Sequence, residues 1–458
     1  MPPVHTYVEA HWERFLEELK DLLRIPSVSA DPAHRADVAR AAQWLADHLR
    51  GLGLEAEVLP TDGHPIVYAE WLGAPDAPTV LCYGHYDVQP PDPLELWESP
   101  PFEPTIRDGK LYARGASDDK GQAFLHLKAL EAYLRAEGRP PVNVKFLLEG
   151  EEEVGSAHLA PFIERHRDRL RADVVLISDT AMFGPEEPSI TYALRGLCYL
   201  EVELEGPNRD LHSGVYGGSV DNPALILARI LAALHDAYGR ITVPGFYDRV
   251  RPLEESERRL LAELPFDEAA YRHDLGLEAL WGELGYTPLE RATARPALDV
   301  NGLWSGYQGP GAKTVLPAQA GAKLSARLVP DQRAQEIAEL IEAHLKRLCP
   351  PTARIRVRRL HGAEPVLVPL DHPALQAAAR ACERVFGRKP YFTREGGSIP
   401  VVALFDRLLG LKSVLLGFGL SSDAIHSPNE HFRLENFRKG IHTVAAFWRE
   451  LAASQGGA

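Results

Sequence analysis

The sequence is poor in sulfur, with four cysteines and two methionines among 458 residues. The cysteines, Cys82, Cys198, Cys349 and Cys382, are scattered along the chain and lack the close spacing of a thiolate metal site. This scarcity excludes a disulfide-stapled scaffold and a cysteine-based metal centre. We interpret the four residues as reduced, buried thiols, which predicts a cytoplasmic protein.

Long apolar runs are also missing, since no stretch holds 18 consecutive apolar residues. The sequence therefore predicts no membrane-spanning helix and no membrane partner. The opening segment, MPPVHTYVEAHWERFLEELKDLLRIPS, repeats apolar residues at helical spacing and has no basic region followed by an apolar core. We expect an acidic amphipathic helix there and no signal peptide.

The chain also lacks an excess of positive charge. The chain has 50 Lys and Arg against 64 Asp and Glu, for a formal net charge of −14. Phosphate binding needs clustered basic residues, so no nucleic-acid partner is expected. The acidic balance suits a site that concentrates cations. With 45% hydrophobic residues, the composition is that of a globular protein, and the length predicts two or three domains.

The first part of the chain alternates short apolar runs with helical patterns. Three nearly continuous apolar segments predict buried strands: TVLCYG at 79–84, NVKFLLEG at 143–150 and DVVLISD at 173–179. The helical pattern GQAFLHLKALEAYLRAEG at 121–138 lies between the first two. This order predicts an α/β fold with a mostly parallel sheet.

The pattern changes near residue 195. LCYLEVELEG at 197–206 alternates apolar with acidic residues, as expected for a strand with one wet face, and similar strands and amphipathic helices follow. Buried-strand character returns in SVLLGFG at 413–419. We therefore predict a discontinuous α/β domain over 1–194 and 370–458, with an inserted α+β domain over 195–369. Residues 240–300, charged and irregular, form an insertion within that second domain.

Histidines and carboxylates follow the predicted buried strands. His85 and Asp87 come after the first, Glu151 to Glu153 after the second, Asp179 after the third and His426 after the strand at 413–419. Asp118 and Asp119 precede the helix at 121–138. Ligands of open α/β sheets bind beyond the carboxyl ends of the strands. The repetition at four strand ends predicts one shared site.

Two histidines with three carboxylates form a ligand set for two divalent metals, and zinc, manganese and cobalt all suit it. Of two adjacent glutamates, one can bind metal while the other takes a proton from water. Each feature alone also has a structural explanation. A histidine after a strand can simply pack, an acidic run can be a solvated loop, and SDD can cap a helix.

The motifs YGHYDVQP, ARGASDDKGQ, EGEEEVGS, ISDT and AIHSPNE together resemble the M20 metallopeptidases, the clan of carnosine dipeptidases, carboxypeptidases and acetylornithine deacetylases. DLHSGVYGGSVDNP and TREGGSIPV are similar to the cytosolic non-specific dipeptidase branch. The resemblance implies one metal on His85, Asp118 and Asp179, and a second on Asp118, Glu153 and His426. Asp118 would bridge the two metals, and its peptide bond to Asp119 would be cis.

The resemblance also assigns the catalytic roles. Glu152 would be the general base and then the general acid, and Asp87 would orient His85. The family pattern Glu-Glu-x-Gly-Ser fits Glu152, Glu153, Gly155 and Ser156, which leaves Glu151 without a role. The expected activity is hydrolysis of dipeptides or short peptides with a free C-terminal carboxylate, with two divalent metals per subunit.

The inserted domain would be a lid that also forms a homodimer. There, the resemblance implies that His212 stabilises the oxyanion in the partner subunit's site and that Arg327 binds the substrate carboxylate. Thr314, Gly397 and Ser398 would contact the substrate backbone. An N-acyl amino acid deacylase of the same fold and a non-catalytic peptide-binding homologue are the alternatives. A phosphoesterase is not supported, because the sequence has no P-loop.

Overall fold

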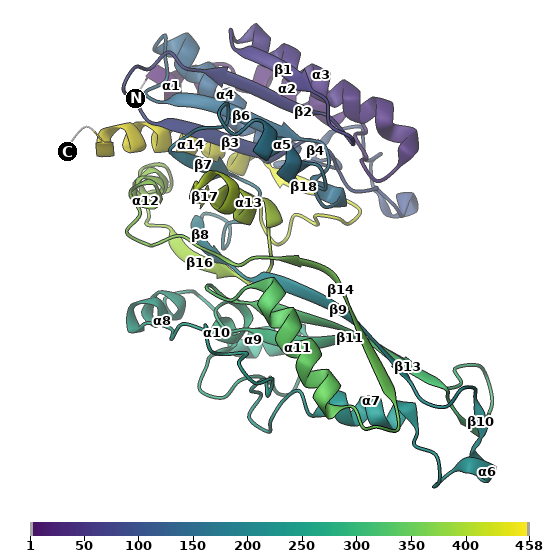
Figure 1. The fold of residues 1–458 in the computed structure, drawn as a ribbon. Helices are drawn as coiled ribbons and strands as arrows, with labels where there is room; N and C mark the ends of the chain where they lie inside the picture. Colours follow the sequence, from purple (N-terminus) through teal and green to yellow (C-terminus); the bar gives the residue numbers. More distant parts are fainter. Residues whose placement is uncertain (1–2, 456–458) are drawn as a thin grey trace. The chain divides into compact units, whose positions relative to one another are not determined.

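The computed structural model describes residues 3–455, which form two compact units (Figure 1). The first unit falls within Met1–Tyr192, Val368–Thr393 and Leu404–Ala458, and the second comprises Ala193–Leu367 and Arg394–Ala403. The sequence-based division placed all of 370–458 in the first domain, whereas the structure groups Arg394–Ala403 with the second unit.

The first unit is built on a mixed β-sheet with a parallel centre. Its strand order is β1 (Glu55–Leu59), β2 (Ile66–Trp71), β6 (Asn143–Glu149), β3 (Thr79–His85), β7 (Val174–Ile177), β17 (Ser413–Leu415) and β8 (Ser189–Leu194). β6, β3, β7 and β17 are parallel neighbours, while β1, β2 and β8 pair antiparallel. The predicted α/β class is confirmed, and the sheet is mixed because its outer strands reverse direction.

Two short strands extend this sheet at β8. β16 (Tyr391–Glu395) pairs with β8, and β15 (Val366–Leu367) pairs antiparallel with the last two residues of β8. A separate small sheet contains β4 (Thr105–Arg107), β5 (Lys110–Tyr112) and β18 (His431–Arg433). The chain passes from the first unit to the second within β8.

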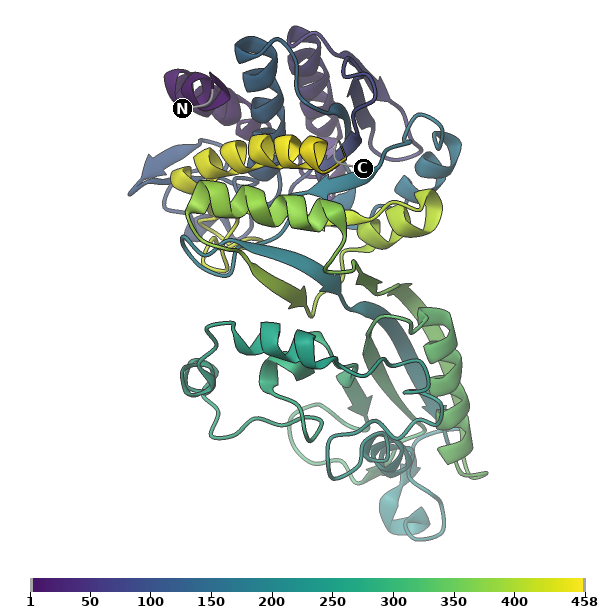
Figure 2. The ribbon, with the colours of Figure 1, turned by 90° about the vertical axis from the view of Figure 1, so that its left-hand side faces the viewer.

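Helices pack on this sheet and on one another. They are α1 (Pro3–Ala10), α2 (Trp12–Leu23), α3 (Arg35–Gly51), α4 (Lys120–Ala136), α5 (Leu159–Arg165), α12 (Pro373–Phe386), α13 (Pro400–Leu409) and α14 (Leu434–Gln455). α3 contacts β1 and β2, α4 contacts β3, and α14 contacts both α4 and α12. Figure 2 shows the yellow α14 running beside the lime-green α12. The single helix predicted at the start is two helices, separated at His11.

The central strands are apolar because both faces of the sheet are covered. Every residue of β3 from Val80 to His85 is buried, and so are all four residues of β7. α4 is buried along most of its length, which includes Lys120 and Lys128. Continuous apolar runs are the expected signature of such strands. The core therefore holds the strand ends rigidly in place.

The second unit contains a four-stranded antiparallel sheet. Its order is β11 (Ala297–Ser305), β13 (Gln319–Leu328), β9 (Gly196–Glu205) and β14 (Arg354–Ala363). α7 (Pro223–Ala232) and α11 (Ala334–Leu348) contribute to the same hydrophobic core as the buried side chains of β9 and β13. Cys198, Leu200, Val202 and Leu204 of β9 are buried while the residues between them are more exposed, as the alternating pattern predicts.

Shorter elements complete the second unit. They are β10 (Leu211–His212), α6 (Ser213–Tyr216), β12 (Val315–Leu316), α8 (Glu255–Ala262), α9 (Glu268–Asp274) and α10 (Pro288–Thr293). The last three lie in the segment predicted as an insertion. Across the described part of the chain, no helix combines the length and apolar character that a membrane crossing requires.

Candidate metal centre

Five side chains with metal-binding atoms meet at one edge of the first unit's sheet. His85 ends β3, Asp179 lies two residues beyond β7, and Glu153 lies in the short helix η3 (Glu152–Val154) that follows β6. Asp118 precedes α4, and His426 lies in the loop between β17 and β18. Because β6, β3 and β7 are parallel neighbours, their carboxyl ends open on the same edge and deliver these side chains to one place.

His85, Asp118 and Asp179 form the first group. One ligand atom from each residue lies within 4.8 Å of the other two. The Nε2 atom of His85 is 3.1 Å from Oδ1 of Asp118 and 3.8 Å from Oδ2 of Asp179. The imidazole is fully buried, whereas both carboxylates are partly exposed. One nitrogen and two oxygens therefore face a common point.

Asp118, Glu153 and His426 form the second group, again within 4.8 Å. The Nε2 atom of His426 is 2.9 Å from Oδ2 of Asp118 and 3.4 Å from Oε2 of Glu153. Asp118 thus turns Oδ1 toward the first group and Oδ2 toward the second. A carboxylate that presents one oxygen to each group has the geometry of a bridging ligand.

Asp87 contacts both the ring of His85 and the main chain of the adjacent glutamates. The Nδ1 atom of His85 is 3.0 Å from the main-chain carbonyl oxygen of Asp87 and 3.4 Å from its carboxylate. The carboxylate accepts hydrogen bonds from the Ser29 hydroxyl and from the main-chain N–H groups of Glu152 and Glu153. The main-chain carbonyl lies nearer to the ring than the carboxylate does, because the carboxylate is bonded to the main chain of Glu152 and Glu153.

The three consecutive glutamates take different positions. Glu151 is buried and accepts hydrogen bonds from the ring of His158 at 2.7 Å and from the main-chain N–H of His64. The carboxylate of Glu152 accepts no hydrogen bond from the described residues. Burial raises the pKa of Glu152, and the negative charges of Glu153 and Asp118 add to this effect. Glu152 is therefore the glutamate of this run that is free to exchange a proton.

The charges in this region do not balance. Burial raises the pKa of Asp179 well above its usual value, and the carboxylates of Asp119 and Asp118 add to the shift. Hydrogen bonds with Asp118 and Glu153 raise the pKa of His426 to about 10. Within residues 3–455, no Lys or Arg forms an ion pair with Asp118, Glu153 or Asp179. Bound divalent cations would compensate this surplus of negative charge, so the donor set fits them.

Two residues that the sequence analysis left without a role support Asp118 and His85. The buried carboxylate of Glu430 accepts hydrogen bonds from the main-chain N–H groups of Asp118 and Ser117, each at 3.0 Å. Asp119 accepts one from the main-chain N–H of His85 at 3.1 Å, and the Asp118–Asp119 peptide bond is cis, as predicted. The sequence signal for Glu430 is its place at the end of the AIHSPNE motif, four residues after His426.

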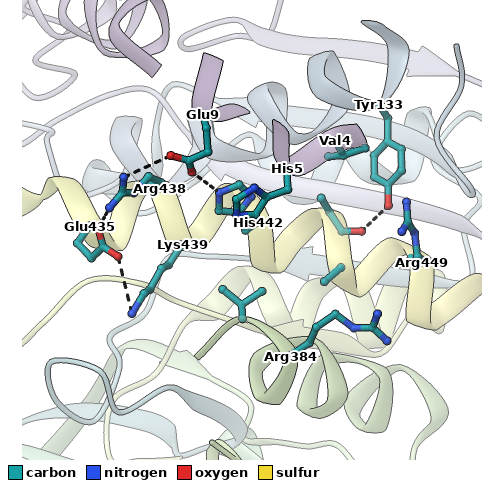
Figure 3. A pocket seen from close by; sticks show the side chains of 13 residues that line it. Val4, His5, Glu9, Tyr133, Arg384, Glu435, Arg438, Lys439, His442 and Arg449 are labelled. Carbon is teal, nitrogen blue, oxygen red and sulfur yellow. Dashed lines mark hydrogen bonds and ion pairs between the residues drawn. The ribbon is translucent and has the colours of Figure 1, made fainter. Parts of the chain in front are cut away.

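Two other clusters resemble metal sites in composition but do not fit one. His5, Glu9 and His442 line a cavity of 470 Å³ beside α1 and α14 (Figure 3). The rings of His5 and His442 are stacked, with centroids 4.3 Å apart and planes 11° from parallel. A metal must lie in the plane of each imidazole that binds it, and two stacked rings share no such point. This cluster does not have the geometry of a metal centre.

The second of these clusters already holds a cation. Glu18, His48 and Glu131 surround the buried ammonium of Lys128, at 2.5, 2.9 and 2.8 Å from its Nζ atom. The ammonium occupies the position that a metal would take. Among the described residues, the two groups that share Asp118 are therefore the ones suited to metal.

The five predicted substrate-binding residues all lie in the second unit of the structure and fall into two sets. In the first, the guanidinium of Arg327 donates to the hydroxyl oxygen of Ser398 at 3.3 Å, and Gly397 lies next to Ser398 in the turn before α13. The Ser398 hydroxyl in turn donates to the main-chain carbonyl of Arg195 at 2.5 Å. The structure thus brings Arg327, Gly397 and Ser398 together.

The second set contains His212 and Thr314. β10, which ends at His212, pairs with β12, and the main-chain N–H of Ser213 donates to the carbonyl of Thr314 at 3.1 Å. Nδ1 of the exposed His212 ring accepts the main-chain N–H of Gly214 at 3.0 Å. In the neutral ring the proton is then on Nε2, so His212 presents a hydrogen-bond donor.

A mixed α/β unit with two histidine–carboxylate groups sharing an aspartate defines a metal-dependent hydrolase. The sequence pattern of Peptidase family M20/M25/M40 matches residues 81–450, and the chain belongs to this family. The resemblance noted in the motifs is confirmed. The comparisons with individual proteins agree with this assignment over nearly the full chain.

Two curated relatives are similar along their whole length. The chain is 33% identical to the Cys-Gly metallodipeptidase dug1 of Schizosaccharomyces pombe, over 98% of each protein. It is 34% identical to the Beta-Ala-His dipeptidase of Homo sapiens, over 98% of this chain and 92% of that one.

Solved structures give the same picture. The M20 family metallo-carboxypeptidase Sso-CP2 from Sulfolobus solfataricus has a TM-score of 0.82 at 34% identity, covering 96% of this chain and 99% of that one. Human carnosine dipeptidase 1 has a TM-score of 0.79 at 33% identity, with 98% of both chains covered.

Proposed function

We propose that the protein is a metal-dependent dipeptidase that hydrolyses dipeptides or short peptides with a free C-terminal carboxylate. The observation that supports this most is the pair of histidine–carboxylate groups that share Asp118, beside Glu152, whose carboxylate accepts no hydrogen bond from the described residues. The names of the relatives, a Cys-Gly metallodipeptidase and a Beta-Ala-His dipeptidase, agree with this substrate class.

We propose that His85, Asp118 and Asp179 hold one divalent cation and that Asp118, Glu153 and His426 hold the other. Imidazole with carboxylate suits zinc best, and it also suits manganese and cobalt. When bound, the cations polarise the substrate carbonyl and make the attacking water more acidic. The same residues, without cations, leave a buried excess of carboxylates.

Glu152 moves the proton in this proposal. Its raised pKa makes it a stronger base than an exposed glutamate, and its carboxylate is not held by other side chains. It takes a proton from the attacking water and then delivers it to the nitrogen of the leaving amine. Asp87 keeps Glu152 in place through the hydrogen bond from the Glu152 main-chain N–H.

The second unit supplies substrate recognition. We propose that the guanidinium of Arg327 binds the substrate's C-terminal carboxylate, with Ser398 and Gly397 beside it, because a planar fork of donors matches a carboxylate. His212, with its proton on Nε2, would donate to the oxyanion, and Thr314 would contact the substrate backbone.

A substrate panel tests the proposed function. The protein, loaded with zinc, manganese or cobalt in turn, is assayed on dipeptides, on N-acetyl amino acids and on a phosphomonoester, before and after chelation. We expect metal-dependent hydrolysis of dipeptides at the highest kcat/KM. A preference for N-acetyl amino acids would instead identify a deacylase, and no turnover of any amide would identify a peptide-binding homologue.

We further propose a cytoplasmic homodimer formed through the second unit. All four cysteines are free, as expected in a reducing compartment. The exposed His212 lies on the two-stranded sheet of β10 and β12, and the proposal places it against the second subunit. Sedimentation equilibrium should give about twice the 50.6 kDa mass of one chain. A monomer with full activity would contradict the dimer.

A further inference from the structure

Arg195 connects β8 to β9 in the second unit and binds the turn that carries Ser398. Its main-chain N–H donates to the carbonyl of Glu395 at 3.1 Å, and its Nε donates to the carbonyl of Gly396 at 3.0 Å. Its own carbonyl accepts the hydroxyl of Ser398 at 2.5 Å. One residue thus fixes three of the four positions from 395 to 398.

The packing of the turn against Arg195 is close. A Cβ atom added to Gly396 would lie 2.8 Å from a terminal nitrogen of Arg195 and 2.4 Å from the carbonyl oxygen of Ala292. Real Cβ atoms do not approach other atoms this closely, so glycine is required here. A second guanidinium hydrogen bond, from Arg195 to the carbonyl of Arg295 at 3.3 Å, holds the other side of the side chain.

These contacts extend to Arg327. The Ser398 hydroxyl donates a hydrogen bond to the main-chain carbonyl of Arg195. The hydroxyl oxygen can therefore accept a hydrogen bond from the guanidinium of Arg327, at 3.3 Å. Arg327 of β13 also pairs in register with Leu197 of β9, two residues from Arg195. The orientation of the Arg327 guanidinium is therefore set by a chain of hydrogen bonds that begins at Arg195.

Both guanidiniums lack an anionic partner. Within residues 3–455, neither Arg195 nor Arg327 forms an ion pair. Burial and the positive charge of Arg327 lower the pKa of Arg195 to about 10, with the charge of Asp299 acting in the opposite direction, so Arg195 remains charged at neutral pH. Two positive charges close together, with no carboxylate of the described residues in an ion pair with either, favour an anionic ligand.

We infer that Arg195 is a positioning residue for the substrate's terminal carboxylate: it holds the 395–398 turn so that Ser398 and Arg327 bind the carboxylate, and its charge makes the site select free acids over amides. This inference rests on the proposed dipeptidase function. It assigns Arg195 to substrate selection without placing it in contact with the reacting atoms.

The test compares a dipeptide with its C-terminal amide in the metal-loaded enzyme. Arg195→Met removes both the charge and the donors, and it should raise KM for the dipeptide by about tenfold or more, with kcat changed less than about threefold. Hydrolysis of the amide should change little, because it has no carboxylate to lose. Arg195→Lys keeps the charge and loses the fork, so its KM should lie between those of the wild type and Arg195→Met.

Two further measurements distinguish positioning from general damage. If Arg195 acts through Ser398, the KM effects of Arg195→Met and Ser398→Ala should be clearly less than additive in the double variant. Arg251→Ala, which removes an exposed ion pair with Asp331 in the same unit, is the control and should behave as wild type.

Equal losses on dipeptide and amide, or an unchanged KM, would overturn the inference. If Arg195→Met does not fold, Arg195→Lys decides by the same criterion. A wild-type enzyme that hydrolyses no dipeptide would contradict the proposed function itself, so the two failures are distinguishable.

Discussion

At the scale of single residues, Asp118 determines whether there is one site or two. Its two carboxylate oxygens face different histidines, at 3.1 Å from His85 and 2.9 Å from His426. Its main chain is held by Glu430, so the carboxylate cannot easily turn toward one histidine only. The two ligand groups are therefore coupled through this side chain.

This coupling predicts the metal content of variants. Asp118→Asn should lose both metals, because a neutral amide is a poor ligand and does not bridge, whereas Asp179→Asn and Glu153→Gln should each lose one. Metal analysis after gel filtration should give about two ions per chain for the wild type and well below one for Asp118→Asn. If Asp118→Asn kept two ions, Asp118 would not be the bridge.

The sequence located the candidate ligands because each follows an apolar strand or precedes a buried helix, and the family resemblance selected Glu153 among the three glutamates and divided the ligands into two groups. His85 and Asp179 could be found by that rule alone, and the structure brings them to 3.8 Å. Glu430 could not be found in this way. It contacts main-chain N–H groups of residues more than 300 positions away, and no local pattern encodes such a contact.

At the scale of elements, the sequence predicted which strands are buried, but it did not predict the direction in which the strands run. Continuous apolar runs identified β3, β6 and β7, and alternation identified β9, because these patterns report which faces are covered. Neither pattern reports strand direction, so the antiparallel outer strands β1 and β2 were not foreseen. The break between α1 and α2 was missed for a similar reason, since the apolar spacing continues across it.

A buried ion cluster joins three helices of the first unit. Lys128 of α4 donates to Glu18 of α2 and to His48 of α3, and Glu131 of α4 completes the cluster. Burial lowers the pKa of His48 to about 4, and the positive charge of Lys128 contributes. His48 is therefore neutral at pH 7 and accepts the hydrogen bond from the ammonium.

The lowered pKa predicts an acid-sensitive contribution to stability. Below pH 6.5 the unfolded chain protonates its histidine while folded His48 stays neutral, so the free energy of unfolding falls as the pH falls from 6.5 toward 4. In His48→Gln, which keeps an acceptor for Lys128 but does not titrate, this fall should be smaller by about 2 kcal/mol. Urea unfolding of both proteins at pH 7, 5 and 4 measures the difference. Parallel pH profiles would show that His48 does not contribute in this way.

At the scale of the whole molecule, the chain carries a net negative charge, and the two metal groups also carry an excess of carboxylates. The formal net charge is −14, and the carboxylates at the sheet edge lack Lys or Arg partners among the described residues. The folded first unit should therefore depend on bound cations for part of its stability, since the unfolded chain does not form the site.

Metal removal should accordingly destabilise the protein. A cation present at about 100 times its Kd stabilises the folded state by about 2.7 kcal/mol per site, so chelation should lower Tm by about 5 °C or more. Differential scanning calorimetry with zinc, with magnesium and with chelator measures this shift. Asp118→Asn should show no difference between zinc and chelator. Equal Tm values for the wild type with zinc and with chelator would mean that the folded protein does not bind the metal there.

The central claim is that Glu152 transfers the proton at a site with two metals, and the kcat of Glu152→Gln at known metal content tests it most directly. The neighbouring Glu151→Gln is the matched control, because the Glu151 carboxylate is hydrogen-bonded to His158 and takes no part in the proposed proton transfer. We predict that Glu152→Gln lowers kcat for a dipeptide by about 1,000-fold with about two metals per chain retained, while Glu151→Gln stays active. A Glu152→Gln enzyme that keeps both metals and turns over within about tenfold of the wild type would contradict the account.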